Sequence, residues 1–335
     1  YLPAWTLADE SSEGDSHTKD SIQDRPQMNI EEGISRSTAA VLVVGDEFMT
    51  GEVRESNSHL IASSLRKSGI PVRQIMVIEN NVDVIAFMLR RLSAVHRYLF
   101  VTGGIGPRHT DVTMLAVAKA FGTGVQEHPA LLRRITAAAT PQTFTNYHWR
   151  MAYIPFGADL VHPPGTEVEE EERLMRQGYV LGAAPEDSNG NTKALTWQEM
   201  MRSWPVIKKN NCFLFPSQPE LLKSRLQFIL PSLASTEDMY STKIVFLANK
   251  AFLAEHIAKA AMVYEAVTTY SYSQYAENVD SNEVVMRTVV LIESEEEQDQ
   301  KAATMQLLES VPSSWVASVE HEYLLKGKAQ TQSSE

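Results

Sequence analysis

The stretch that decides the fold is Tyr98-Leu-Phe-Val-Thr-Gly-Gly-Ile-Gly-Pro-Arg-His-Thr-Asp111. In it an apolar run is followed by three glycines and then by the start of a predicted helix. Tyr98–Thr102 predicts a buried strand, and Asp111 predicts the N-cap of a helix that begins near Val112. The glycines between them give the backbone freedom for a tight turn. Such a turn directs backbone N–H groups to one spot, which suits a phosphate, although a turn with no ligand has the same pattern.

The chain before this stretch alternates strands and helices. Strands are predicted at Ala39–Val44 and Pro71–Ile78, and helices at the apolar stripe Leu60, Ile61 and Leu65 and at Val82–Leu92. Strands that are apolar throughout predict a parallel sheet with helices on both faces. Ligands of such sheets bind beyond the carboxyl ends of the strands, where Gly45-Asp46-Glu47 and Gly103-Gly104 both lie.

The chain after this stretch is irregular at first and then compact. Solvated surface loops are predicted at residues 167–172 and 183–193. A strand is predicted at Asn211–Phe215, and a helix is expected from Glu220. From Lys243 the predicted order is strand, helix, strand, strand, helix, strand, which is a split β-α-β unit. The predicted elements are Ile244–Ala248, Phe252–Tyr264, Ala266–Tyr272, Glu283–Glu293, Gln298–Leu308 and Trp315–Val319.

These elements predict an α/β protein, and its 335 residues are enough for two domains. The predicted parts are an acidic N-terminal arm at 1–38, a three-layer α/β domain with a parallel sheet at 39–240, a small β-α-β-β-α-β domain at 241–325, and a tail at 326–335.

Composition narrows the classes of function. No run of about 18 apolar residues is present, so no membrane span is expected. A net charge of -12 argues against a primary nucleic-acid surface, because phosphate backbones are bound mainly by Lys and Arg; direct nucleic-acid contact is expected to be minor at most. The single cysteine, Cys212, excludes an internal disulfide and fits a reducing compartment.

Residues 1–37 are polar and acidic, with few apolar anchors beyond Leu2, Trp5 and Leu7. This composition is typical of disorder, and such an arm gains order by lying on its own globule or on a partner chain. The sequence starts at Tyr1 instead of Met, as expected either after removal of an organellar presequence or for a trimmed chain. We therefore expect a mitochondrial location, with the cytoplasm as the alternative.

Three blocks resemble the molybdopterin-binding-like family of MoaB, MogA and the N-terminal part of CinA proteins. The first block is VGDEFMTG, residues 44–51, followed by Glu55-Ser-Asn57; the second is TGGIGPRHTDVT, residues 102–113; the third is LFPSQPE, residues 214–220. Segments 152–158 and 164–166 match further landmarks. The resemblance is strongest to the CinA type and to the corresponding domain of eukaryotic FAD synthases, and it implies that fold over about residues 39–325.

The resemblance also implies a site for a phosphorylated ligand, a pterin or a nucleotide, together with Mg²⁺. The residues implied to contact phosphate or nucleotide are Gly45, Asn57, Thr102, Gly103, Gly104, Gly106, Arg108 and Ser217. Asp46 and Asp111 are implied to hold the Mg²⁺ or to orient water. The residues by themselves equally allow Asp111 to cap a helix and Asp46 to close a turn.

Six positions depart from the family pattern, and the changes at Glu55 and Ser56, which replace Asp and Thr, are mild. Arg108 and Thr110 stand where relatives have Thr and Asp, so one carboxylate is missing. Ser217 replaces a glycine that would let the backbone approach a phosphate, and Gln218 replaces an apolar residue. Because the fork of Arg108 suits phosphate oxygens, these changes imply retained binding and weakened catalysis.

Two functions follow as expectations. The first is a pseudoenzyme: a non-catalytic scaffold or binding subunit that contacts other proteins of a larger assembly through residues 1–37, for example a mitochondrial ribosome or its assembly machinery. The second is a Mg²⁺-dependent pyrophosphatase or hydrolase that acts on FAD, ADP-ribose or a similar dinucleotide, as CinA-type relatives are associated with such hydrolysis. Binding of a pterin without hydrolysis is a third, weaker alternative.

Overall fold

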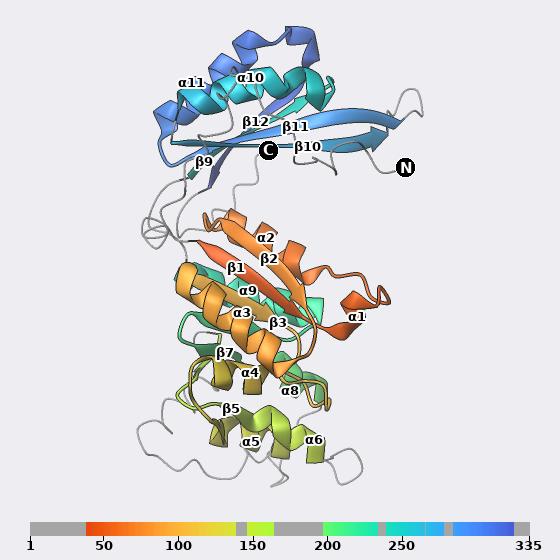
Figure 1. Cartoon of the computed structure of the whole chain (residues 1–335), viewed down its shortest axis with the longest axis vertical. Coiled ribbons are helices and arrows are strands. Elements are labelled where there is room, and N and C mark those ends of the chain that lie inside the picture. The colour runs from red at the N-terminus through yellow and green to blue at the C-terminus, as the bar shows by residue number, and fades with distance from the viewer. Residues whose placement is uncertain are drawn as a thin grey trace, which may run out of the picture.

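A computed structural model describes residues 38–138, 146–163, 197–233, 239–264, 266–277 and 284–324. Two sheets with separate apolar cores organise these residues, and Figure 1 shows the first sheet below the second. The expectations for residues 1–37, for the loops at 167–172 and 183–193 and for the tail lie outside the described residues. Among the described helices, none has the length and apolar character needed to cross a bilayer.

The first sheet has the strand order β2-β1-β3-β8-β7-β6. Its strands are β1 (Ala39–Val44), β2 (Val72–Ile78), β3 (Tyr98–Thr102), β6 (Asp159–Val161), β7 (Val206–Lys209) and β8 (Cys212–Phe215). Strands β2, β1, β3 and β8 run parallel, which confirms the predicted parallel sheet. The sheet continues with β7, which pairs antiparallel with β8, and with β6, which pairs antiparallel with β7. The sequence pattern did not predict this extension. A separate antiparallel pair joins β4 (Val125–Glu127) to β5 (Tyr153–Pro155).

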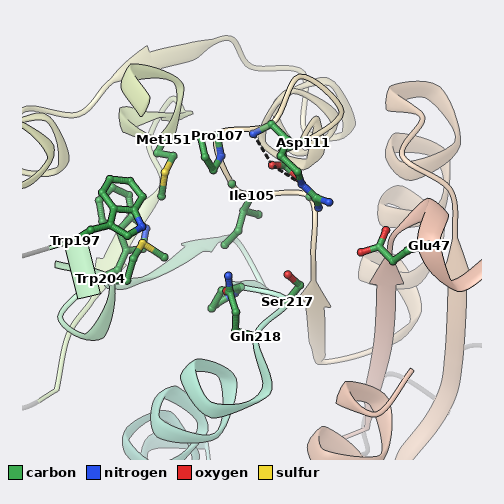
Figure 2. Close-up of a pocket in the computed structure, with 14 residues that line it drawn as sticks. Glu47, Ile105, Pro107, Asp111, Met151, Trp197, Trp204, Ser217 and Gln218 are labelled. Atoms are coloured by element: carbon green, nitrogen blue, oxygen red, sulfur yellow. Dashed lines mark hydrogen bonds and ion pairs between the residues drawn. The ribbon is translucent and has the colours of Figure 1, made fainter. Parts of the chain in front are cut away.

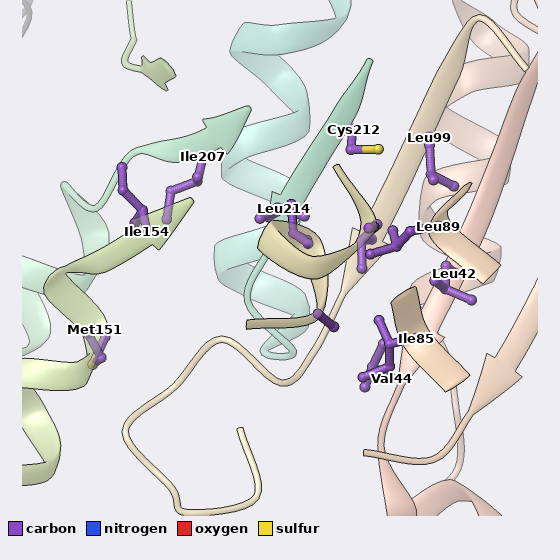
Figure 3. Packing of buried hydrophobic residues seen from close by; sticks show 14 of the residues in the cluster. Leu42, Val44, Ile85, Leu89, Leu99, Met151, Ile154, Ile207, Cys212 and Leu214 are labelled. Carbon is purple, nitrogen blue, oxygen red and sulfur yellow. The ribbon is translucent and has the colours of Figure 1, made fainter. Parts of the chain in front are cut away.

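Helices cover both faces of this sheet. They are α1 (Asp46–Met49), α2 (Asn57–Lys67), α3 (Val82–Val95), α4 (Thr113–Ala120), α5 (Pro129–Ala138), α6 (Asn146–Trp149), the 3₁₀ turn Arg150–Ala152, α8 (Trp197–Arg202) and α9 (Pro219–Leu233). On one face Ile85 and Leu89 of α3 pack against Leu42 of β1 (Figure 3). On the other face Ile61 of α2 packs in the cluster that holds Phe100. Strand β1 is therefore buried on both faces, which explains why its sequence is apolar throughout.

The helix after the glycine turn differs from the prediction at its first residues. Helix α4 begins at Thr113 with Val112 in the N-cap position, and no side chain caps it. The prediction that Asp111 caps this helix is wrong, because the Asp111 carboxylate accepts hydrogen bonds from Arg108. A charged guanidinium is a stronger donor to a carboxylate than the neutral amide of a helix start.

The second sheet has the order β10-β11-β9-β12, and all its pairs are antiparallel. Its elements are β9 (Met239–Phe246), α10 (Lys250–Val263), β10 (Val267–Glu277), β11 (Val284–Ser294), α11 (Glu297–Ser310), the 3₁₀ turn Ser313–Trp315 and β12 (Val316–Leu324). The predicted strand and helix order of this part is confirmed. Helices α10 and α11 both pack on one face of the sheet, as a split β-α-β unit requires.

Candidate functional site

The candidate site lies where the order of the parallel strands reverses. From β1 the chain crosses to β2 on one side, and it returns to β3 on the other side of β1. The carboxyl ends of β1 and β3 are therefore neighbours, and they carry Gly45-Asp46 and Gly103-Gly104. A crevice at such a reversal is where ligands of open α/β sheets bind.

Two glycines form the turn after β3. Gly103 has φ of 98° and Gly104 has φ of 66°, backbone conformations that residues with a side chain rarely adopt. A Cβ atom on Gly103 would lie 2.1 Å from the carbonyl oxygen of Val44 at the end of β1. A Cβ atom on Gly104 would lie 2.3 Å from Thr113 Oγ1. Glycine is therefore required here by the close approach of β1, β3 and α4.

The turn leaves backbone donors unused. Gly103 N–H donates to Phe215 O, and Thr113 N–H donates to Gly104 O. The N–H groups of Gly104, Ile105 and Gly106 have no acceptor within the described part of the chain. Consecutive amides without an acceptor beside a glycine turn are available to bind an anion.

Asp111 and Arg108 form a closed pair at the far side of the turn. The Asp111 carboxylate accepts hydrogen bonds from the Arg108 backbone N–H at 2.8 Å, from Nε at 3.3 Å and from Nη2 at 3.1 Å. Its side chain is 2% exposed, whereas that of Arg108 is 55% exposed. The hydrogen bond from Arg108 to Asp111 raises the pKa of Arg108, and the nearby carboxylates of Glu47 and Asp46 raise it further. Arg108 is thus a permanent cation with donors still turned to solvent.

Arg150 supports this turn from outside. Its guanidinium donates to the carbonyl oxygens of Arg108 at 3.1 Å and of Asp111 at 3.4 Å. These contacts fix the backbone between the two residues, although Arg150 is distant from them in the sequence.

Asn57 joins the three sequence blocks. Its side-chain amide donates to Thr102 Oγ1 at 3.2 Å and to Ser217 O at 2.8 Å. Thr102 in turn donates to Pro216 O at 3.0 Å. Asn57 and Thr102 are buried, so their part in the site is to hold the carboxyl ends of β3 and β8 together.

Asp46 lies at the exposed start of α1 and is tied to the loop after β2. Its carboxylate accepts from the backbone N–H of Asn80 at 2.8 Å and from Asn80 Nδ2 at 3.2 Å. Gly45 N–H donates to Ile78 O in the same region. These contacts hold the end of β1 against the end of β2.

A pocket of about 420 Å³ opens beside the glycine turn (Figure 2). One wall carries Asp111 with the turn, and the facing wall carries Trp197, Trp204 and Met151. Arg108 also lines the pocket, paired with Asp111. The full lining is Glu47, Gly104, Ile105, Gly106, Pro107, Arg108, Asp111, Met151, Trp197, Met201, Trp204, Pro216, Ser217 and Gln218. Arg108 and the residues of the glycine turn thus share one cavity with two tryptophans, and its size suits a small organic ligand.

A buried arginine supports the aromatic wall. Arg225 of α9 is 1% exposed and donates to the carbonyl oxygens of Trp204, Met201 and Leu221. Burial lowers the pKa of Arg225 to about 10, so the group is still charged at neutral pH. Its contacts fix the end of α8, and with it Trp204, against α9.

The structure brings some of the predicted site residues together and separates others. The pocket is lined by Gly104, Gly106, Arg108, Asp111 and Ser217. The other predicted residues, Gly45, Asp46, Asn57, Thr102 and Gly103, do not line it. Sequence reasoning missed the aromatic wall, Arg150 and Arg225. The segment WQEMMRSWP at 197–205, with two tryptophans and two methionines, was the available signal for the wall.

Asp111 does not fit a Mg²⁺ ligand as it lies, because Arg108 engages both of its oxygens and supplies the neutralising charge. Asp46 is exposed and retains lone pairs for a hydrated Mg²⁺. Among the described residues no cluster of three or more His, Cys, Asp or Glu side chains is arranged to hold a metal ion. Mg²⁺ stays a prediction, and no chemical step is derived through it.

Comparison with known proteins places this geometry in a family context. The family described as "Probable molybdopterin binding domain" matches residues 40–235, which is more than half of the chain. A Caenorhabditis elegans protein named "Probable FAD synthase" is 40% identical over 91 residues, which are 27% of this chain and 18% of that protein. A "CinA-like protein" of Gloeothece citriformis is 32% identical over 132 residues, 38% of this chain and 32% of that protein.

These matches are partial. The matched segment spans less than a third of each of these two relatives. Among solved structures, CinA of Thermoplasma acidophilum, a protein described as of unknown function, aligns with 59% of this chain and 99% of its own chain at 19% identity and a TM-score of 0.44.

Proposed function

The chain belongs to the family of probable molybdopterin binding domains, and we propose that its pocket binds a phosphorylated ligand with a flat ring, a pterin or a nucleotide, without efficient turnover. The observation that carries the proposal is the pairing of free amides at Gly104–Gly106 with an aromatic wall across one cavity. The amides and Arg108 would hold the phosphate. The ring would lie against Trp197 and Trp204, where an aromatic surface gives stacking and burial.

Weak turnover is proposed from the state of Asp111. A carboxylate that orients water or holds a cation needs an available oxygen, but the Asp111 side chain is almost fully buried and engaged by Arg108. Binding therefore relies on Arg108 and the backbone, and the missing carboxylate at position 110 removes the nearest substitute for Asp111.

The test is a titration of the full chain with FMN, FAD, AMP, ADP-ribose and inorganic phosphate, followed by calorimetry. We expect binding of at least one ring-bearing phosphate, and a loss of roughly tenfold or more in affinity for Arg108→Ala, since charge-assisted hydrogen bonds contribute ~1.5–3 kcal/mol. Arg91→Ala, an exposed arginine of α3 that does not line the pocket, is the matched control and should leave the affinity unchanged. Equal affinities for Arg108→Ala and the parent chain would refute the proposed phosphate contact.

The second candidate is a Mg²⁺-dependent pyrophosphatase acting on FAD, ADP-ribose or a similar dinucleotide. Exposed Asp46 at the carboxyl end of β1 favours it, because this carboxylate lies close enough to Arg108 to raise its pKa. The name of the C. elegans relative also supports a flavin or adenine nucleotide as the ligand. AMP release in Mg²⁺ or Co²⁺ that disappears in Asp111→Ala would support this candidate, and no turnover of any dinucleotide would end it.

A restoring variant separates the two candidates. Arg108→Thr, Thr110→Asp and Ser217→Gly together restore three of the positions that depart from the family pattern. If the pocket lost an activity, this triple variant should release AMP where the parent chain does not. If the triple variant binds the ligand and stays inactive, the loss of activity does not lie at these positions.

Membership in a larger assembly is a further part of the proposal. The acidic composition of residues 1–37, together with the altered site blocks, supports a scaffold or binding subunit that contacts other proteins through this arm, in mitochondria or otherwise in the cytoplasm. A mitochondrial ribosome or its assembly machinery is one such setting. Sedimentation of the tagged protein from fractionated cells tests it: migration as a free monomer or dimer in every fraction would exclude the scaffold role.

A further inference from the structure

The second sheet has one face that no described helix covers. Helices α10 and α11 lie on its outer side, away from the first sheet (Figure 1). Ile244, Val290 and Ile292 point toward these helices and form the core. Successive side chains of a strand point to opposite faces. The other face, here called the open face, therefore presents Lys243, Val245, Tyr270, Tyr272, Val289 and Leu291.

An apolar row crosses the open face. The register pairs Tyr272 with Val289, and Val289 with Val245, so the three side chains lie side by side on neighbouring strands. Val289 is 0% exposed and Val245 is 8% exposed, yet neither belongs to an apolar cluster of the described residues. Tyr272 itself is 46% exposed. Two of the three side chains are thus shielded from solvent although no apolar cluster of the described residues contains them, and the exposed Tyr272 leaves the row open to contact with a further apolar segment.

The described chain begins at one end of this face. Ala39 N–H donates to Pro71 O at 2.9 Å, which places the start of β1 beside the loop that follows α2. In the last turn of α2, Arg66 donates to Ser241 Oγ at 3.0 Å and to Glu293 Oε1, again at 3.0 Å from Nε. Ser241 and Glu293 lie on β9 and β11 at the edge of the open face. Residues 1–37 therefore join the described chain next to the open face.

The composition of residues 1–37 fits the open face better than that of the other segments near it. Residues 278–283 and 325–335 carry one large apolar residue each, Val279 and Leu325. Residues 1–37 carry several: Leu2, Trp5, Leu7, Ile22, Met28, Ile30 and Ile34. They also carry an excess of acidic residues, and Arg287 on the open face has a buried Nε with no hydrogen-bond partner within the described residues.

We propose that residues from 1–37 dock in cis on the open face, with apolar side chains over the row Tyr272, Val289 and Val245 and an acidic side chain at Arg287. The docked segment belongs to the same chain, so its effective concentration is high and modest contacts suffice. A partner protein that binds residues 1–37 then has to displace them from the open face. This docking is independent of the ligand in the pocket.

The first test is photo-crosslinking in the full chain. Tyr272→p-benzoylphenylalanine places the reactive group on the open face, and Tyr147→p-benzoylphenylalanine, on exposed α6, is the matched control. After irradiation we expect peptides of residues 1–37 to be linked to position 272, in a species that migrates as a monomer, and no such peptides from the control. Products from position 272 that lack residues 1–37, or products with them that migrate as dimers, would overturn docking in cis.

The second test is hydrogen exchange of residues 1–37. Tyr272→Asp inserts a charge into the apolar row and should speed exchange in the docked peptides by roughly tenfold or more, because protection follows the local opening equilibrium. Tyr275→Asp is the control, since Tyr275 lies on the same strand, points to the opposite face and is 71% exposed. Equal exchange in Tyr272→Asp and the parent chain would overturn the proposal.

Discussion

The side-chain amide of Asn57 donates a hydrogen bond of 2.8 Å to the carbonyl oxygen of Ser217, which lies 160 positions later in the chain. The same amide donates to Thr102, so the start of α2 holds the ends of β3 and β8 together. Asn57 and Thr102 themselves do not line the pocket, although Ser217 does. Asn57 therefore acts by positioning one wall of the pocket.

Asn57→Ala should destabilise the fold by ~1–3 kcal/mol, because the substitution leaves buried acceptors without a donor. Thr102→Val removes the linked hydroxyl at nearly constant volume. Urea unfolding of the two single variants and of the double variant measures their coupling, which we expect at ~0.5–3 kcal/mol for residues in one hydrogen-bond network. Strict additivity would show that the two side chains act independently.

Gly103→Ala should be far more costly than Gly122→Ala. Both glycines have positive φ, at 98° and 65°, so each alanine would pay a backbone strain of ~1–2 kcal/mol. Only Gly103 faces the Val44 carbonyl oxygen at 2.1 Å from a new Cβ atom, whereas no atom lies within 4 Å at Gly122. Thermal unfolding should show a small shift for Gly122→Ala and a much larger shift, or failure to fold, for Gly103→Ala; similar shifts would contradict the close approach of β1 and β3.

Arg225→Met should destabilise the protein by ~1–3 kcal/mol, because the carbonyl oxygens of Trp204 and Met201 lose a charged donor. Since Arg225 fixes the backbone at Trp204, we also expect altered tryptophan fluorescence and weaker ligand binding. Arg202→Met, at the end of the neighbouring α8, is a control for the loss of a positive charge. Unchanged stability in Arg225→Met would mean that the carbonyl oxygens find other donors.

Cys212 should be almost unreactive in the folded protein. It is 0% exposed, and burial raises the pKa of its thiol to about 12. The thiolate is the reactive form, so at pH 8 its fraction falls by roughly three orders of magnitude relative to a free thiol. The raised pKa also means that stability should decline above about pH 9, where an unfolded thiol ionises and the buried one does not. Reaction with a chromogenic disulfide, with and without denaturant, measures the first effect; equal rates would contradict the burial.

Ligand affinity should rise between pH 5 and pH 7.5 if the ligand carries a terminal phosphate. The hydrogen bond to Asp111 raises the pKa of Arg108, so this cation keeps its charge throughout that range. The second ionisation of a phosphate monoester has a pKa of about 6, and the added negative charge strengthens its contact with Arg108. Calorimetry at both pH values tests this expectation. A diester such as FAD, which lacks this ionisation, is the control and should show no such rise.

The sequence by itself determined the elements of this protein. Apolar runs such as Ala39–Val44 determine the parallel strands, and their alternation with helices determines the layers. Gly103 and Gly104 determine the turn after β3, because both have positive φ. These features depend on residues that are neighbours in the chain, so periodicity and backbone preferences suffice to read them. The resemblance of the three blocks also anticipated the family that matches residues 40–235.

Only the tertiary structure decided how the site is assembled. The path of the turn decides whether the Asp111 carboxylate caps α4 or accepts hydrogen bonds from Arg108. Arg150, which follows α6, stabilises this path by donating to the Arg108 carbonyl oxygen. The tryptophan wall likewise depends on packing, since Arg225 of α9 donates to the carbonyl oxygens of Met201 at the end of α8 and of Trp204 beyond it. Arg108 and Asp111 are close in sequence, but the contacts of Arg150 and Arg225 that hold these segments join residues far apart in the chain, and packing selects them among many partners, so no local pattern records them.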